Sequence, residues 1–240
     1  MTAVFGALPA LPQTYKVLYE FPGSTSHGEN PYYETLARDS ADNLYGTTEY
    51  GGASGQGTVF KVDAAGVEAV LYSFTGGRDG AQPLASLLRD LAGNLYSTAF
   101  SGGASGVGVV FKLDTTGKLT VLHSFAGGTD GQYPWSDLVR DAAGNFYGTT
   151  FYGGASNYGV VFKIDTTRAE TVLYSFTGGA DGGNPVAGVI LDSVGNPYGA
   201  TNIGGVPGMG YGVVFELNPA GAETVLHTFA GGSDGANPAV

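Results

Sequence analysis

The chain has 240 residues, of which 42 are Gly, 11 are Pro and none is Cys, and 42% are hydrophobic. This composition describes a folded domain with many turns, and it excludes disulfides, thiol catalysis and thiolate metal sites. Charged residues make up 13% and the formal net charge is −11. Because the ten Lys and Arg are scattered, we expect neither a nucleic acid nor an anionic membrane surface as partner.

The N-terminal stretch 1–12 is a poor match to a signal peptide, since it has no basic segment and contains two prolines. Val4-Phe5 instead aligns with Val59-Phe60 and is expected to be part of a repeat. No stretch of the sequence approaches the roughly eighteen consecutive apolar residues of a membrane span. We therefore expect no membrane span.

One strand pattern recurs five times along the chain, with starts 53, 51, 51 and 53 residues apart. The copies are Val17-Leu-Tyr-Glu-Phe21, Val70-Leu-Tyr-Ser-Phe74, Val121-Leu-His-Ser-Phe125, Val172-Leu-Tyr-Ser-Phe176 and Val225-Leu-His-Thr-Phe229. A Val-Phe strand and a polar turn, such as Asp63-Ala-Ala-Gly66, precede each copy. This spacing predicts a β-hairpin in every repeat.

A glycine-rich loop follows each final Phe and ends in Asp-Gly-x-x-Pro. The loops run from Asp79, Asp130, Asp181 and Asp234, and His27 to Pro31 is a divergent first copy. Each proline opens a further strand, which turns through a second hairpin at Asp39, Asp90, Asp141 or Asp192. Asp, Asn and Gly at such corners are typical of turns.

Each repeat thus contains four short strands in two hairpins, and no segment has helical periodicity. Four strands in about fifty residues predict an all-β fold, a β-propeller of four-stranded antiparallel blades. We expect one domain over 1–240, with repeat units at about 31–74, 83–125, 134–176 and 185–229. A fifth, incomplete closing blade is expected from 1–21 plus 234–240. The alternative is a ring completed by a neighbouring chain.

The repeat resembles the GloVer tandem repeat of bacterial "choice-of-anchor" surface proteins. The motifs that carry the resemblance are Gly-Val-Val-Phe-Lys-x-Asp, Thr-Val-Leu-Tyr-Ser-Phe, Gly-Gly-x-Asp-Gly-x-x-Pro and Gly-Asn-Leu-Tyr-Gly-Thr-Thr, which occur in order over nearly the whole chain. The resemblance implies an extracellular or cell-surface repeat protein. It implies no catalytic residues, and the export signal and anchor usual in the family are not found in this sequence.

The candidate ligand-binding residues belong to two groups. Aromatic side chains beside a carboxylate can bind a sugar, because a flat apolar face and a hydrogen-bond acceptor meet its two surfaces. Such sets are Tyr32, Tyr33 and Glu34 in the first copy, and Tyr133, Trp135 and Asp137 in the third. The loop carboxylates Asp79, Asp130, Asp181 and Asp234 form the second group, on loops where binding is common. The structural alternatives are core packing for Trp135 and Tyr32 and turn formation for the aspartates.

The sequence therefore favours a non-enzymatic extracellular scaffold for binding or adhesion, with a glycan or a cell-surface protein as partner. An alternative is a self-assembling structural protein, an oligomer or filament, in which terminal strands complete a neighbour's blade. A glycoside-processing enzyme is a third hypothesis, but the ten carboxylates outside the repeated positions, Glu68, Glu170 and Glu223 among them, provide no recognisable pair. We expect no metal site and no cofactor, since the three His are dispersed and no calcium-loop pattern occurs.

Overall fold

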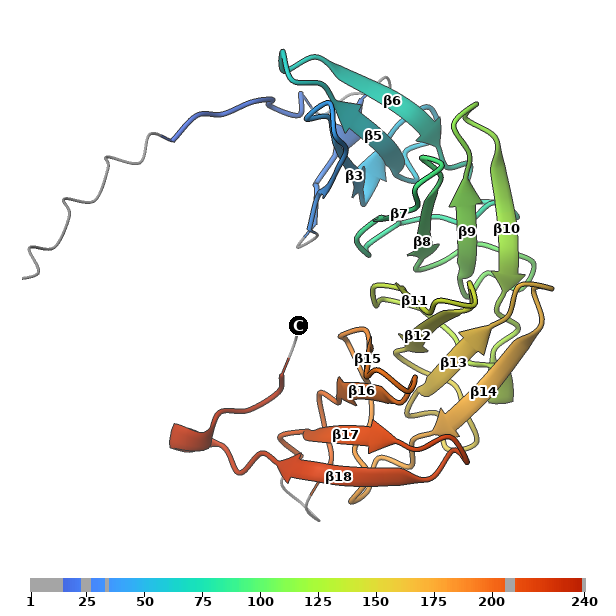
Figure 1. The fold of residues 1–240 in the computed structure, drawn as a ribbon, viewed down its shortest axis with the longest axis vertical. Helices are drawn as coiled ribbons and strands as arrows, with labels where there is room; N and C mark the ends of the chain where they lie inside the picture. The colour runs from blue at the N-terminus through green and yellow to red at the C-terminus, as the bar shows by residue number, and fades with distance from the viewer. Residues whose placement is uncertain (1–14, 23–26, 33–34, 206–209, 239–240) are drawn as a thin grey trace, which may run out of the picture.

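The computed structural model describes residues 15–22, 27–32, 35–205 and 210–238. They form four four-stranded antiparallel sheets, the blades, arranged side by side in an arc (Figure 1). In each blade the strands follow one another in chain order from the inner to the outer edge of the arc. The all-β propeller architecture predicted from the repeats is thereby confirmed.

The strands of the four blades occupy equivalent positions in successive repeats. The first blade holds β2 (Ala37–Arg38), β3 (Leu44–Thr48), β5 (Thr58–Val62) and β6 (Glu68–Ser73). The second holds β7 (Leu88–Arg89), β8 (Leu95–Ala99), β9 (Val109–Leu113) and β10 (Leu119–Ser124). The third holds β11 (Val139–Arg140), β12 (Phe146–Thr150), β13 (Val160–Ile164) and β14 (Glu170–Ser175). The last holds β15 (Ile190–Leu191), β16 (Pro197–Ala200), β17 (Val213–Leu217) and β18 (Glu223–Thr228).

The inner hairpin of each blade is closed by the side chain of its repeated aspartate. Asp90, for example, accepts hydrogen bonds from the backbone N–H of Asn94 at 2.8 Å, the Asn94 side chain at 2.8 Å and the Tyr96 hydroxyl at 3.1 Å. Such bonds replace the backbone partners that a tight turn leaves unsatisfied. The outer hairpin contains a β-bulge in every blade, at Leu71 in the first, where the register shifts between Val59 and Phe60.

Neighbouring blades pack through a repeated pair of phenylalanines, and these contacts form the core. The ring centroids of Phe74 and Phe111 lie 5.2 Å apart in an edge-to-face arrangement. The two later interfaces repeat it, with Phe125 and Phe162 at 5.2 Å and Phe176 and Phe215 at 5.1 Å. The core is therefore a row of interfaces between blades, as the apolar residues on both strand faces require.

The Asp-Gly-x-x-Pro loops connect each blade to the next. Their backbone bridges the following blade, as in the antiparallel pairing of Gln132 with Tyr152, and in the first copy this bridge extends into two short strands, β1 (Gly28–Glu29) and β4 (Tyr50–Gly51). Gly131 is required here, because an added Cβ would lie 2.7 Å from the Thr150 hydroxyl oxygen and φ is +93°. Two single 3₁₀ turns, η1 (Gly128–Asp130) and η2 (Gly232–Asp234), fall in these loops.

The predicted closing blade lies partly outside the described residues, which exclude the Val4-Phe5 strand. Residues 15–22 form no strand, although Phe21 packs on Phe60 with ring centroids 4.9 Å apart, as the final Phe of each blade does on its successor. At the other end, Asn237 donates its backbone N–H to Tyr211 O at 2.8 Å, as Gln82 does to Gln56 O. Both terminal segments thus occupy linker or outer-strand positions, and the closing blade itself stays a prediction.

Candidate functional site

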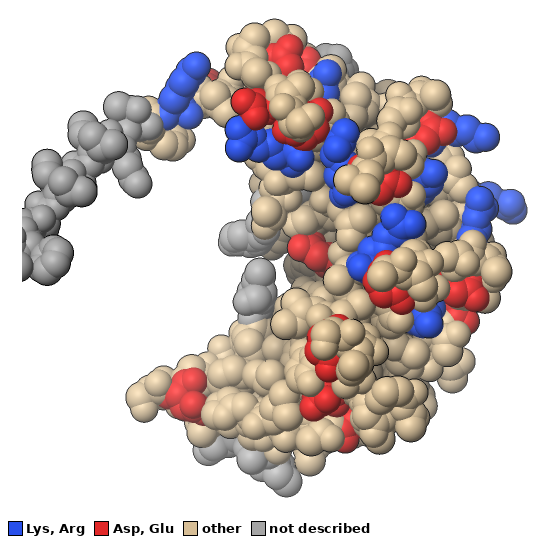
Figure 2. All heavy atoms as spheres, in the orientation of Figure 1, with Lys and Arg blue, Asp and Glu red and all other residues tan. Residues whose placement is uncertain are grey.

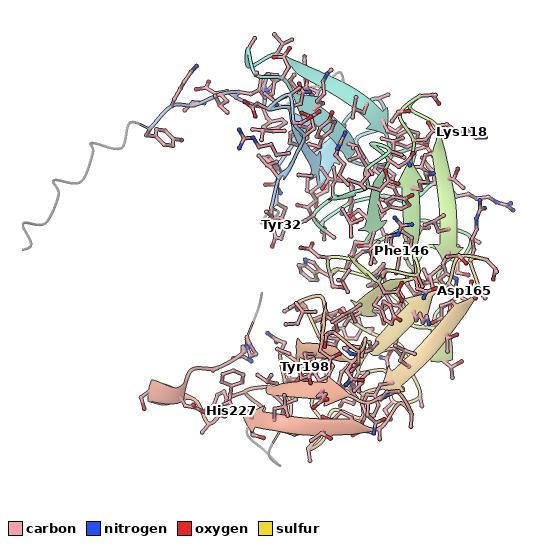
Figure 3. The ribbon with its side chains drawn as sticks, viewed as in Figure 1. Tyr32, Lys118, Phe146, Asp165, Tyr198 and His227 are labelled. Atoms are coloured by element: carbon pink, nitrogen blue, oxygen red, sulfur yellow. The ribbon has the colours of Figure 1, made fainter. Side chains whose placement is uncertain are left out.

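Two of the predicted ligand-binding residues, from the first and the third repeat, meet at the inner margin of the arc. Tyr32 and Trp135 each follow the proline that opens a repeat, and their ring centroids are 6.4 Å apart. Figure 3 shows Tyr32 pointing to the inner side of the arc. Both side chains are half-buried. The curvature of the blade array therefore brings residues of distant repeats together. The sequence predicts a binding set in each of these two repeats but does not predict that the sets meet.

Further aromatic rings surround Trp135. Phe100 lies 5.6 Å and Phe151 lies 5.7 Å from Trp135, and Phe100 also stacks on Tyr133 at 4.9 Å with an interplanar angle of 25°. We call Tyr32, Phe100, Tyr133, Trp135 and Phe151 the axial aromatic cluster. All five rings are partly exposed, so they offer flat apolar surface to a ligand.

Tyr133 adopts an unusual backbone conformation for a large aromatic residue. Its φ is +58°, in the left-handed region that glycine and asparagine tolerate best. Asn30, Asn184 and Asn237 hold the same place in three other repeats. Gln82 adopts this conformation as well, so it belongs to the repeated loop, and what distinguishes Tyr133 is the aromatic ring that it adds to the cluster.

Hydrogen bonds link neighbouring blades beside the cluster. They are made by the residue that stands four positions before each inner-hairpin aspartate. Thr35 donates its backbone N–H to the Ser86 hydroxyl at 2.9 Å, and Ser86 donates its own to an Asp137 carboxylate oxygen at 2.6 Å. A cavity of about 270 Å³ lies here, and Thr35, Ser86, Trp135 and Asp137 are among its lining residues. Gly188 ends the series without a side chain. Asp137 therefore places an exposed acceptor in the same cavity as Trp135.

The loop aspartates are held inside their own loops. Asp79 accepts hydrogen bonds from Tyr72, from the backbone N–H of Thr75 at 2.8 Å and from the Thr75 hydroxyl. Asp181 accepts in the same way from Tyr174 and Thr177. Asp130 bonds to His123 and to the backbone N–H of Ala126. Asp234 bonds to His227 and to the backbone N–H of Ala230. Burial raises the pKa of Asp79, but the bonds from Thr75 and Tyr72 outweigh it, and the net shift is downward. These carboxylates form the loops, and their proposed part in binding has no further support from the geometry.

Tyr33 and Glu34 lie outside the described residues, so their part in the predicted site stays a prediction. In the part of the chain that the structure describes, no three His, Asp or Glu side chains are grouped as a metal ion would require. Nor does any described helix have the length and apolar character to cross a membrane.

The sequence reasoning missed a further repeated acidic position, at the start of the outer strand. Glu68, Glu170 and Glu223 stand two residues before the repeated valine, where the second blade has Leu119, so treating them as outside the repeat was wrong. Burial, reinforced by Asp130, raises the pKa of Glu170 to about 7, and burial with Asp181 does the same for Glu223. Extending the alignment of the outer strands two residues before the repeated valine would have revealed the position.

The first repeat differs because His27 replaces the loop aspartate. Its Nδ1 lies 2.9 Å from a Glu68 carboxylate oxygen, and the Glu68 side chain is only 2% exposed. In the third blade a carboxylate faces Glu170 instead: Asp130 and Glu170 line one cavity of about 370 Å³. The glutamate at this position therefore has a histidine partner in the first blade, whereas in the third blade it is repelled by an aspartate.

The blades, their linkers and the inner cluster define a β-propeller-like scaffold of tandem repeats. The model of the Gloeobacter/Verrucomicrobia repeat matches residues 3–210, and the chain belongs to this family. The resemblance noted in the sequence is thereby confirmed. No curated protein sequence matches the chain.

Solved structures with a similar fold are remote in sequence. A gluconolactonase from Xanthomonas campestris shares 15% identity at a TM-score of 0.53, over 82% of this chain and 62% of that protein. An extracellular domain from B. thetaiotaomicron, described as part of a hybrid two-component system, shares 10% at 0.49, over 85% and 22%. A luciferin-regenerating enzyme shares 16% at 0.47, over 84% and 76%. At these identities the first likeness shows the fold alone, and the chain spans less than two thirds of that protein.

Proposed function

We propose that this chain is a non-enzymatic, extracellular or cell-surface scaffold that binds a glycan at the axial aromatic cluster. The observation that carries the proposal is the meeting of Tyr32 and Trp135 beside a cavity that Trp135 and Asp137 line. A sugar ring presents an apolar face that stacks on aromatic rings and hydroxyls that donate to a carboxylate. Trp135 and Asp137 offer both in one cavity, and Tyr32 adds a second ring beside it.

Packing alone explains the arrangement less well. Leu84 and Val186, at the position of Trp135 in other repeats, are half-buried as Trp135 is, so this position leaves its side chain partly exposed and a tryptophan here offers a flat apolar surface. Tyr133, an aromatic residue where the other repeats have Asn or Gln, also belongs to the cluster. Three departures from the repeat, Tyr32, Tyr133 and Trp135, therefore fall at one place, as expected when a single site is added to a repeated scaffold.

Binding without catalysis is favoured over glycoside hydrolysis. Hydrolysis requires two carboxylates about 5–10 Å apart. Among the described residues that line the cavity, Asp137 is the one carboxylate. Localisation at the cell surface is proposed from the family resemblance.

A glycan array with purified protein tests the proposal. The wild-type chain should bind a restricted set of glycans, and Trp135→Ala should weaken binding at least tenfold, about 1.4 kcal/mol. Tyr158→Ala is the matched control, because Tyr158 is an aromatic residue of the surface outside the cluster, 38% exposed, and its removal should leave binding intact. Binding that survives Trp135→Ala would contradict the proposal.

A further inference from the structure

The two ends of the arc expose faces that the interior blades bury. Leu87, Leu138 and Val189 are 4–6% exposed where each packs under the preceding blade, but Leu36 at the same position of the first blade is 42% exposed. At the opposite end, Leu226 is 50% exposed and Phe229 is only half-buried, although Phe74, Phe125 and Phe176 are fully buried. The first blade thus has a head face that residues 15–22 cover only in part, and the last blade has an exposed tail face.

These two faces are complementary, because each is one side of the interface repeated three times within the chain. An interior head face presents Leu87, Leu95, Phe111 and Leu113, and the valine and phenylalanine of the preceding blade pack against it. The first blade carries the full equivalent set: Leu36, Leu44, Phe60 and Val62. The tail face carries the matching valine and phenylalanine, Val214 and Phe229.

A repeated cation–π contact supports the same match between the head face and the tail face. At two interior interfaces an arginine of the inner strand lies over the tyrosine of the preceding blade, Arg89 over Tyr45 at 5.7 Å and Arg140 over Tyr96 at 5.8 Å. The head face has an arginine at this position, Arg38, whose side chain is 64% exposed. The tail face has the tyrosine, Tyr198, at the open side of the arc (Figure 3).

The charged side chains also differ between the two end blades. Every Lys and Arg lies before residue 169, so the last blade has acidic side chains and no Lys or Arg, and Figure 2 shows basic groups gathered over the other blades. Glu216 stands on the last blade where Lys61, Lys112 and Lys163 stand on the others. An acidic tail face would therefore meet the head face at Arg38.

We propose that the tail face of one copy packs on the head face of a second copy of this chain, repeating the interior blade contact. Phe229 of one copy would take the place on Phe60 that Phe21 now occupies, and Arg38 would lie over Tyr198. Residues 15–22 form no strand and leave a cavity of about 430 Å³ on the head face, so their cover is looser than a blade. The contact is heterologous, since different surfaces meet, and it builds a ring or a filament.

Two variants, each disabling one face, test this model in the full chain. Leu36→Glu places a charge in the head face and Leu226→Glu places one in the tail face, and both positions are exposed, so folding should be retained and is checked by circular dichroism. Val194→Glu is the control, because Val194 is 76% exposed and belongs to neither face. Mass is measured by light scattering over a series of protein concentrations.

The wild type and Val194→Glu should associate with rising concentration, and each face variant alone should associate at least tenfold more weakly. An equimolar mixture of Leu36→Glu and Leu226→Glu should form a dimer of twice 24.4 kDa, because each variant keeps the face that the other lacks. The model is overturned if the wild type stays at 24.4 kDa, if Leu226→Glu alone associates as the wild type does, or if the mixture stays monomeric.

Discussion

Glu170 and Leu119 occupy one position in two successive blades, and they show what a buried carboxylate does at this interface. The Glu170 Oε1 atom is buried and has no hydrogen-bond partner among the described residues. Desolvation of a charge without compensation opposes folding, and the nearby Asp130 adds repulsion. The second blade avoids both effects with a leucine.

Glu170→Leu should therefore stabilise the protein at pH 8, by about 1–3 kcal/mol. Urea unfolding of the variant and the wild type at this pH measures the difference. Glu68→Leu is the matched control, since Glu68 loses its contact with His27 and should gain little or nothing. Equal stabilisation by both substitutions would show that burial of leucine, and not relief of the buried charge, is responsible.

Stability should depend on pH with a maximum on the acidic side of neutrality. The pKa values of Glu170 and Glu223 are raised to about 7, so their contribution is full below about 4.5 and is lost as the pH rises through 7. Burial opposes the shift at Asp90, but the bonds from Asn94 and Tyr96 lower its pKa, so its contribution is lost as the pH falls below the usual value. The Tm should be higher at pH 5.5 than at pH 8, and Glu170→Leu should reduce this difference. A Tm that rises from pH 5.5 to 8 would contradict the assignment.

Individual residues could be predicted only where their role was local. The inner-hairpin aspartates were read as turn residues, because an Asp followed four residues later by Asn satisfies its bonds within one turn. The buried glutamates could not be interpreted from spacing alone, since their environment is made by the loop of another repeat. The same holds for Asp137, whose partner Ser86 belongs to the preceding blade.

At the scale of the element, the blade is the unit that the sequence determines. Alternation in the strands, the polar turns and the spacing of Val and Phe predict both hairpins of every blade, and the structure confirms them in all four. The bulge in the outer hairpin was not predicted, because no residue type marks Leu71 or its equivalents. Contacts between blades stabilise the fold beyond these local signals, since one blade cannot bury both of its apolar faces alone.

Loss of an interior phenylalanine should cost far more than loss of its equivalent at the end of the arc. Phe125→Ala removes a fully buried ring that packs on Phe162, and we expect it to reduce the free energy of unfolding by about 3–5 kcal/mol. Phe229→Ala serves as the internal comparison, because its ring is only half-buried in the isolated chain, and it should cost less than about 2 kcal/mol. Denaturant titration at low protein concentration measures both, and equal losses would refute the described exposure of the tail face.

At the scale of the whole molecule, the arc produces what no single repeat contains. Tyr32 and Trp135 belong to different repeats and come together through the curvature of the blade array. Sequence predicts that blades stack, but it does not determine which residues of separate blades converge, because that depends on the rotation between neighbours. The sequence therefore predicts one set of binding residues in the first repeat and another in the third, and the structure brings Tyr32 of the first set to Trp135 of the other.

The central claim, that the axial aromatic cluster binds a glycan, can be tested through the one tryptophan in the sequence. Since Trp135 is that residue, its intrinsic fluorescence reports from the proposed site without a label. Soluble oligosaccharides of glucose, xylose and mannose would be titrated into the wild type and into Tyr32→Ala, which keeps the reporter. We predict a saturable change in emission with at least one series, and binding weakened at least tenfold in Tyr32→Ala. A change of the same affinity in both proteins, or no change with any series, would contradict the claim.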